Sequence, residues 1–570
     1  MSAWGKRVNT LLISLFLILA LALPVNGETR ALEDQGFWIS EGRDSAGAPM
    51  TNLKALVDIR DWSKGEIVCD SSSDSKCAGK ALLASMYLIP CAISSTVGCI
   101  TEVYAVSRDG RRINGTFIKS VAKIKNLTFE QNSAIQLAAG EGMGGLWRFP
   151  DLVHGGKSDL YAVQARITGN NSSSTTPIRY ESAQFAISPV QEGTTTAQEP
   201  KIEFNSEGIY QGGFGFDLDC VMHEKGVCYK RATFPEGYRF GIEVQLPNPL
   251  LGWFHGRFAK PEFSVLTDSN SRVRYRLEAD PVVVPELKAK VPYSSWTTDF
   301  RDYARSQWPI SGAGSGATSY MMPGVMGKLA MELARRYLPM VDDKATASAS
   351  FWVVKSLNEW SDGKTAETIN PRVLSCTKDA GGIAGLVTTN AMVYGQGPPD
   401  FNEANQSLDY KVLSPHLNES GLENLGSYDL LIDGSVARCI YGFSNAPIKA
   451  ELEIIGGDGV SKVATTVLGE RGKWLFLSAN GFTYSNPTIR VKLSQDKSVA
   501  STPTPTPTVA ASVTPTSTPS AEASPSPSMA NTSTQVSAVK KTITCVKGKT
   551  TRKVTGVAPK CPKGFKKKAA

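Results

Sequence analysis

The sequence predicts a mainly β protein that contains several antiparallel β-sandwiches and one short helical connector. Three observations lead to this prediction. Apolar residues recur at every second position in several segments, turn-forming residues separate these segments, and only one segment has clear helical periodicity. Hydrophobic residues make up 41% of the 570-residue chain, which is enough to bury several cores. Many short strands with frequent turns are typical of antiparallel sandwiches.

The alternating segments share one pattern: apolar side chains occupy every second position, and polar or small residues lie between them. A strand with one buried face and one solvated face has this pattern. Glycine, proline, asparagine and aspartate separate the strands, as in the turns at 247–249 and 456–459. The clearest segments are 161–167, 240–246, 273–277, 450–454 and 489–493.

The helical segment, residues 323–338, reads PGVMGKLAMELARRYL. Pro323 suits the first turn of a helix, and Pro339 ends it. The alternative to a packed connector is a helix on a membrane surface, but the polar face is too sparsely basic for a lipid anchor. We therefore predict a connector. Its apolar positions are Met326, Leu329, Ala330, Leu333 and Tyr337.

The amino-terminal residues have the composition of a secretion signal. Lys6 and Arg7 precede the apolar stretch 11–25, and small residues follow it. We predict cleavage after Gly27; the alternative is an uncleaved anchor. No later segment has the roughly 20 apolar residues that a spanning helix needs, so we expect no transmembrane segment in the mature chain.

Composition divides the chain into seven parts. Residues 498–536 are rich in proline, threonine and serine and contain a single charged residue between 500 and 536, so this part cannot bury a core and should stay extended as a linker. The expected parts are a signal peptide (1–27), a β-rich domain (28–195), a sandwich-like domain (200–290), a connector with the helix (291–365), a sandwich domain (366–497), the linker (498–536) and a basic two-cysteine tail (537–570).

The ten cysteines are even in number, and an even count in an exported chain favours disulfides. The first three pairs each have a spacing of eight residues and enclose a stretch that can turn, so we expect pairing between neighbours. A zinc site is the alternative, but there is no C-x-x-C pair and the four histidines are scattered. We predict no metal and no cofactor. The expected pairs are Cys69 with Cys77, Cys91 with Cys99, Cys220 with Cys228, Cys376 with Cys439, and Cys545 with Cys561.

The net charge of +8 hides an uneven distribution. The signal contributes +2 and residues 540–570 contribute +11, which leaves −5 for the chain between them. A body with this charge does not suit nucleic-acid binding. We expect the tail to form a hairpin from strands at 542–546 and 550–554. Attachment to an anionic wall polymer or surface glycan is our interpretation, with a solubilising cap as the alternative. The basic residues expected to bind the polyanion are Lys540, Lys541, Lys547, Lys549, Arg552, Lys553, Lys560, Lys563, Lys566, Lys567 and Lys568.

Two loops that combine glycine with aromatic residues are the candidate sites for glycan binding. One contains Trp147, with His154 nearby, and the other contains Trp253 and His255. An exposed aromatic ring can stack on the apolar face of a sugar. The alternative is that both tryptophans fill sandwich cores, with glycines allowing close turns.

The sequence contains no recognisable catalytic motif, and we predict that the protein is not an enzyme. The glycines at 312–316 do not have the spacing of a nucleophile elbow, and H-E-x-x-H is absent. Asp217 and Asp219 would share one face of a strand, where paired carboxylates could hydrolyse a polysaccharide. A solvated or calcium-contacting strand edge is the favoured interpretation of this pair.

Several phrases carry a resemblance to a known group. They include LLGWFHGRF at 250–258, SLDYKVLSPHL at 407–417, SYDLLIDGSVARCIYGFSNA at 427–446 and the tail from 543 onward. On these phrases the chain resembles uncharacterised exported, cell-surface proteins of actinobacteria with a Pro/Thr linker and a basic two-cysteine tail module. The resemblance implies location and architecture. We expect a secreted surface protein that binds the wall through its tail and a glycan or another surface protein through its body. The alternatives are an exported polysaccharide-active hydrolase and a structural coat protein.

Overall fold

The computed structural model has two compact units, residues 1–499 and 500–570, which we name the body and the tail. Each is considered by itself. The predicted signal peptide and linker lie outside the described residues. The structure describes residues 36–39, 50–94, 97–214, 220–287, 291, 293–307, 319–322, 327–357, 370–395, 397–444, 448–456, 461–463, 467–484, 487–495, 541–547, 550–556 and 566–567.

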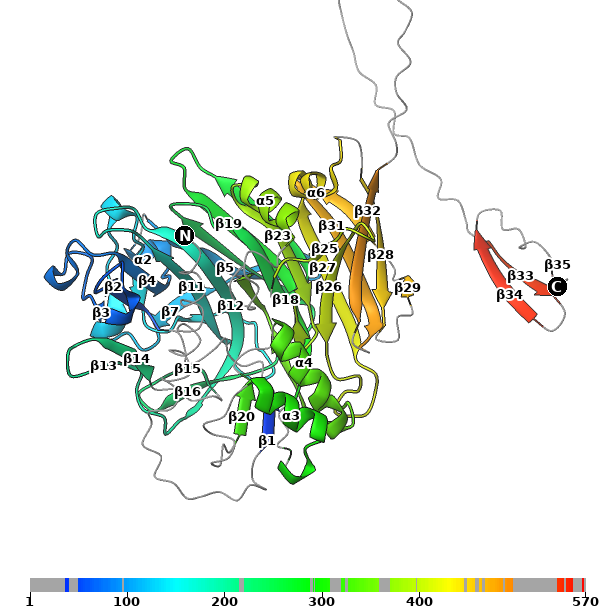
Figure 1. Ribbon diagram of the computed structural model, residues 1–570, viewed down its shortest axis with the longest axis horizontal. Coiled ribbons are helices and arrows are strands. Elements are labelled where there is room, and N and C mark those ends of the chain that lie inside the picture. Colours follow the sequence, from blue (N-terminus) through cyan, green and yellow to red (C-terminus); the bar gives the residue numbers. More distant parts are fainter. Residues whose placement is uncertain are drawn as a thin grey trace, which may run out of the picture. The chain divides into compact units, whose positions relative to one another are not determined.

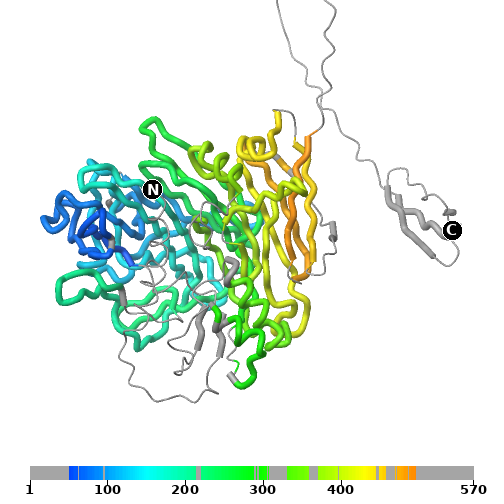
Figure 2. Tube along the Cα trace, viewed as in Figure 1, coloured from blue at the N-terminus to red at the C-terminus, as the bar shows by residue number. Residues whose placement is uncertain are grey.

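The largest sheet runs through the whole body. Neighbouring strands in it are antiparallel, except that β18 and β23 are parallel. Figure 2 shows the chain passing from blue at one side of the body to orange at the other, so the sheets largely follow sequence order. The strands are, in spatial order, β3 (Glu66–Val68), β2 (Asn52–Leu56), β4 (Leu82–Tyr87), β11 (Leu160–Asn170), β12 (Arg179–Thr194), β22 (Val353–Leu357), β18 (Gly252–Thr267), β23 (Ile383–Thr389), β27 (Leu425–Asp433), β31 (Trp474–Thr483) and β30 (Val467–Arg471).

A second sheet packs on the first half of this large sheet and encloses the first core. Strand β18 belongs to both sheets, because its first part pairs with β22 and β23 whereas its second part pairs with β19. The alternating apolar side chains of β17 and β19 are buried against those of β11 and β12. The strands are, in order, β6 (Arg112–Asn114), β5 (Cys99–Ser107), β17 (Tyr238–Leu246), β19 (Val273–Glu286) and β18.

A third sheet and four helices enclose a second core against the other half of the large sheet (Figure 1). Buried residues of α3 (Thr298–Gln307), α4 (Gly327–Tyr337), α5 (Pro371–Asp379) and α6 (Gly434–Tyr441) contribute to this core. The strands are, in order, β24 (Val393–Tyr394), β26 (Ser407–Leu413), β32 (Thr488–Gln495), β28 (Ile448–Ile455) and β29 (Ser461–Val463), and β25 (Asp400–Asn402) also pairs with β26.

The other elements are short or lie at the edges of these sheets. They are β1 (Gly36–Ile39), β7 (Thr116–Ser120), β8 (Thr128–Phe129), β9 (Gly140–Glu141), β10 (Gly145–Arg148), β13 (Lys201–Phe204), β14 (Tyr210–Phe214), β15 (Cys220–Glu224), β16 (Val227–Arg231), β20 (Ser319–Met322), β21 (Ala347–Phe351) and α2 (Cys91–Ser94). No helix in the described ranges is both long and apolar enough to cross a membrane.

The structure confirms the mainly β prediction and the connector helix, whose described part is α4. It also contains α3, α5 and α6, which the expectation of one helical connector left out. Strands from different expected domains pair directly, because β5 pairs with β17 and β12 pairs with β22. The described body is therefore continuous across those expected boundaries.

Four of the expected cysteine pairs are disulfides: Cys69–Cys77, Cys91–Cys99, Cys220–Cys228 and Cys376–Cys439. The proposed bond from Cys545 involves Cys561, which lies outside the described residues. The predicted hairpin of the tail is confirmed: β33 (Lys541–Lys547) pairs with β34 (Thr550–Gly556), and β35 (Lys566–Lys567) pairs with β33.

Candidate functional site

The candidate site is a pocket of about 490 Å³ where β18 leaves the large sheet and becomes the edge of the second sheet. Its apolar lining comes from β18, β27 and β31, and its polar lining comes from β18 and β19. The apolar residues are Pro261, Phe263, Leu431, Trp474 and Phe476; the polar residues are Glu262, Ser264, Arg276 and Glu278. This volume is within the range of small-ligand sites.

A β-bulge in β18 creates this arrangement. The pairing of β18 with β19 shifts register between Ala259 and Glu262, and Lys260 has a positive φ of 51°. A residue other than glycine is strained there, so the surrounding structure must hold it. Two contacts do so: the Lys260 amide donates to Asp429 Oδ2 at 2.7 Å, and its carbonyl accepts from Arg239 at 3.1 Å. Bulges commonly redirect side chains next to functional sites, and this one places Glu262 directly opposite Glu278.

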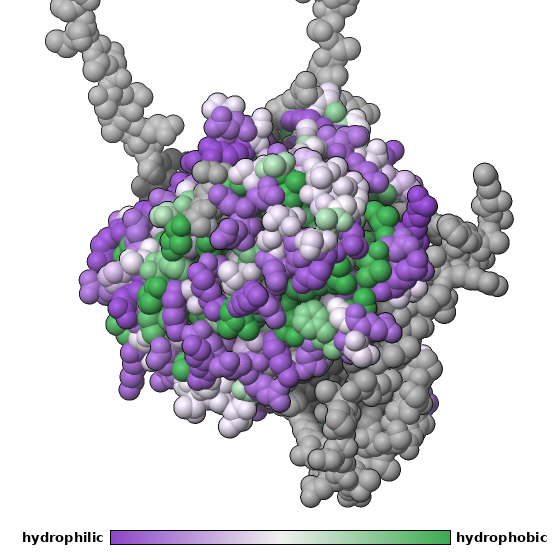
Figure 3. Space-filling view, turned by 90° about the vertical axis from the view of Figure 1, so that its left-hand side faces the viewer, coloured by the Kyte–Doolittle hydropathy of each residue, from purple (hydrophilic) through white to green (hydrophobic). Residues whose placement is uncertain are grey.

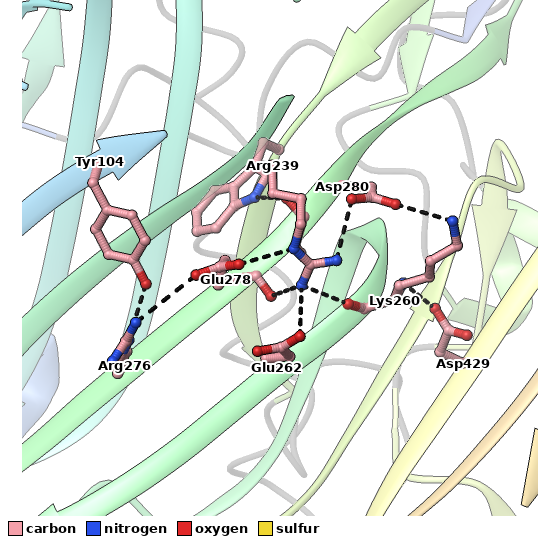
Figure 4. Close-up of polar contacts among 10 residues, drawn as sticks. Tyr104, Arg239, Lys260, Glu262, Arg276, Glu278, Asp280 and Asp429 are labelled. Atoms are coloured by element: carbon pink, nitrogen blue, oxygen red, sulfur yellow. Dashed lines mark hydrogen bonds and ion pairs between the residues drawn. The ribbon is translucent and has the colours of Figure 1, made fainter. Parts of the chain in front are cut away.

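Arg239 is the centre of the charged network beside the pocket (Figure 4). Its guanidinium lies 2.9 Å from Glu278, 3.2 Å from Asp280 and 3.4 Å from Glu262, measured between nitrogen and carboxylate oxygen. Lys260 Nζ also contacts Asp280, at 3.2 Å. Single surface ion pairs stabilise a fold only weakly, so we infer that this network mainly fixes the geometry of the rim.

Arg276, on β19, is held at the rim of the pocket by Tyr104 and Glu278. Its Nε donates to the Tyr104 hydroxyl at 3.0 Å, and its guanidinium lies 3.9 Å from Glu278. Burial raises the pKa of Tyr104, so this hydroxyl stays neutral and available as an acceptor. The rim thus presents a fixed guanidinium and two carboxylates, which can bind hydroxyl, amide or cationic groups of a ligand.

Asp429, on β27, holds the bulge of β18 in place. It is fully buried, and its Oδ2 accepts from the Lys260 amide and from the Thr388 hydroxyl. Burial raises the pKa of this carboxyl. Burying a carboxyl is costly, and here the carboxyl holds the strained residue that shapes the pocket.

The four residues expected to bind glycans are in the interior. Between 1% and 5% of the surface of Trp147, His154, Trp253 and His255 is exposed. A Cβ at Gly385 would overlap the ring of Trp253, so the glycine allows the ring to pack closely. The surface-stacking interpretation is therefore wrong for these residues, and the core-filling alternative is correct for both tryptophans.

The two histidines differ in their surroundings. His154 Nε2 lies 3.0 Å from the Leu160 carbonyl and 3.1 Å from the Val190 carbonyl, and the Gly156 amide donates to its Nδ1 at 3.0 Å. His255 stacks on Tyr394 with ring centres 3.5 Å apart, and neither ring nitrogen has a hydrogen-bond partner. Burial, together with the nearby Arg257 and Lys355, lowers the pKa of His255 well below 6.5.

We predict that His255 makes the fold sensitive to acid. In the unfolded chain the imidazole of His255 binds a proton as pH falls through about 6.5, whereas in the folded state it stays neutral. The free energy of unfolding should therefore fall by about 1.4 kcal/mol per pH unit below that value. A His255→Phe variant keeps the stacking on Tyr394 without the titratable group. Urea denaturation at pH 7.5 and pH 5 should give a smaller difference for this variant than for the native protein. A Phe254→Leu variant on the same strand should keep the native difference; an unchanged difference in the phenylalanine variant would exclude His255 as its source.

The remaining expected sites are only partly described. Asp217 and Asp219 lie outside the described residues, as do Lys540, Lys549, Lys560, Lys563 and Lys568 of the tail. Lys541, Lys547, Arg552, Lys553, Lys566 and Lys567 lie on its three strands. No cluster of three or more potential metal ligands occurs among the residues that the structure describes.

Comparison with known proteins gives no functional assignment: no family model, curated protein or solved structure matches the chain. The chemistry of the site is therefore the basis for the function proposed below. The pocket was missed from the sequence, although Pro261, which follows Lys260 in β18, was a usable signal, because proline inside a strand indicates an edge or a bulge.

Proposed function

We propose that this is a secreted, cell-surface binding protein. Its tail attaches to an anionic cell-wall polymer or surface glycan, and its body binds a glycan or another surface protein through the pocket beside β18. The observation that carries this proposal is the bulge at Lys260, held by Asp429 and Arg239, which brings two carboxylates and a guanidinium to the rim of one pocket.

The rim suits binding better than hydrolysis. Glu262 and Glu278 are opposite each other in the register, but both contact the guanidinium of Arg239. A glycosidase needs two carboxyl groups on opposite sides of the scissile bond. Two carboxylates joined through one cation are better placed to orient a ligand than to act separately on it.

The composition of the tail supports the attachment role. Residues 540–570 contain eleven lysine or arginine residues and no acidic residue. The pairing of β33 with both β34 and β35 brings Lys566 and Lys567 beside the hairpin, next to Cys545 and Val546 in the register. Several cations on one small sheet attract a polyanion, and salt screens this attraction.

We predict that replacing Lys566, Lys567 and Lys568 by glutamine weakens binding to purified wall polymer and reduces its salt dependence. Attraction between exposed charges is largely screened when the Debye length falls to about 3 Å near 1 M salt. Pull-down with anionic polymer at low and high salt measures both effects. Replacing Lys64, Lys157 and Lys225 of the body by glutamine removes the same charge and is the matched control. Undiminished binding by a chain that ends at residue 536 would exclude the tail as the anchor.

The pocket requires its own test. Glu262→Gln and Arg276→Gln variants should lose binding to the body's ligand on arrays of glycans and surface proteins, while the tail still binds the polymer. Glu181, an exposed glutamate on β12, provides the control substitution Glu181→Gln. If both rim variants bind every arrayed ligand as the native protein does, the pocket is not the site. Oligomers that form with concentration in sedimentation would instead favour a structural coat.

A further inference from the structure

The pocket lies beside an open strand edge. From Glu262 to Thr267, strand β18 pairs with β19 on one side, and no strand of the described chain pairs with its other side. Along such an edge, alternate residues direct backbone N–H and C=O groups outward, where another strand can pair with them. Six residues of strand are about 20 Å long, enough for a short peptide.

We propose that the ligand of this site is an extended polypeptide segment that adds as a strand to the free edge of β18. One apolar side chain of the segment enters the pocket, and a basic side chain lies beside Glu262. This inference rests on the binding role proposed for the pocket and narrows its ligand class to a protein.

The apolar lining favours a polypeptide over a sugar. Phe263, Leu431, Trp474 and Phe476 have between 2% and 8% of their surface exposed, so none of the three aromatic residues among them presents a free ring face to a pyranose. A ligand side chain inserted between β18 and the strands β27 and β31 of the large sheet can contact the edges of these apolar side chains. Backbone hydrogen bonds to β18 would then supply the affinity, and the pocket would supply the selectivity for alternate side chains.

The charges at the rim of the pocket indicate which charge a neighbouring side chain of the ligand should carry. Among the charged residues that line the pocket, Glu262 is the most accessible, with 61% of its side chain exposed and its contact to Arg239 at 3.4 Å; Lys260, which is 68% exposed, contacts Asp280 and does not line the pocket. Arg276 is turned toward Tyr104, to which it donates a hydrogen bond. An outward-facing side chain on an added strand would lie across from Glu262. Opposite charges attract and like charges repel in such a cross-strand pair, so a basic side chain is favoured there.

A fluorescent hexapeptide library tests the proposal on the full chain. Its members alternate valine, leucine, isoleucine or phenylalanine with threonine, lysine or glutamate, and fluorescence polarisation measures binding. We expect lysine members to bind more tightly than glutamate members by about two- to fivefold, the value of an exposed ion pair. Glu262→Lys should reverse this preference, whereas Glu181→Lys should leave it unchanged.

Backbone methylation of the selected peptides distinguishes strand addition from other modes. N-methyl groups at alternate residues block one edge of a strand, so one of the two methylation patterns should weaken binding by at least about tenfold and the other should be tolerated. Equal tolerance of both patterns would overturn strand addition. Binding of glycans but not peptides, lost in Glu262→Gln, would overturn the polypeptide class and keep the proposed function. If peptides, glycans and surface proteins all fail to bind, both the strand-addition proposal and the proposed binding function are overturned.

Discussion

Replacing Trp253 by alanine should lower the free energy of unfolding by about 3–5 kcal/mol, the usual loss for truncating a large buried aromatic side chain. The ring is 2% exposed and belongs to the core between the large sheet and the third sheet. It packs over Gly385, and its Nε1 donates to Thr377 Oγ1 at 3.1 Å. Alanine would leave a cavity between β18, β23 and α5. Urea denaturation followed by far-ultraviolet circular dichroism measures the loss without using tryptophan fluorescence.

A Trp253→Phe variant separates packing from hydrogen bonding. It keeps much of the ring but leaves the Thr377 hydroxyl without this donor, so we expect a smaller loss, about 1–2 kcal/mol. Thr377→Val provides a second measure of the same bond. A Trp253→Ala protein that unfolds at the native urea concentration yet no longer binds its ligand would show that the ring acts at a surface, contrary to the structure.

The alternating segments were the part of the fold that could be predicted from sequence. Phe240, Ile242, Val244 and Leu246 all face the first core, as their spacing indicates. The helices α5 and α6 were missed because each has fewer than ten residues, and about two turns are too few for a helical period to be told from other patterns. Their ends nevertheless had recognisable signals: Asn370 caps α5, and the side chain of Asp433 caps α6.

The site could not be predicted because its parts are far apart in sequence. The bulge near residue 260 is held by Asp429, and the pocket combines Glu262 with Trp474. Nothing local in the sequence indicates that β18 leaves one sheet and packs over β27 and β31. The glycine-rich aromatic loops were misinterpreted for a related reason: glycine beside tryptophan allows either an exposed loop or very close packing, and only tertiary contacts distinguish them.

Removal of the Cys376–Cys439 bond should be the most destabilising change among the disulfides. This bond joins α5 to α6 across a sequence separation of 63 residues. In the chain-entropy model, closing a loop of this length stabilises the fold by about 4 kcal/mol, against about 2.5 kcal/mol for an eight-residue loop. A Cys376→Ala, Cys439→Ala protein should therefore lose more stability than a Cys91→Ala, Cys99→Ala protein.

Denaturation of the two double variants under identical conditions measures this difference, and each variant removes one bond without leaving a free thiol. The slope of unfolding free energy against denaturant concentration also carries information, because an unfolded chain without the longer crosslink is more expanded and should give a steeper slope. Equal losses in the two variants would mean that local packing around each bond, rather than loop length, sets its contribution. In that case the second core would hold α5 and α6 in place without the crosslink, through Val373, Val436 and Ile440.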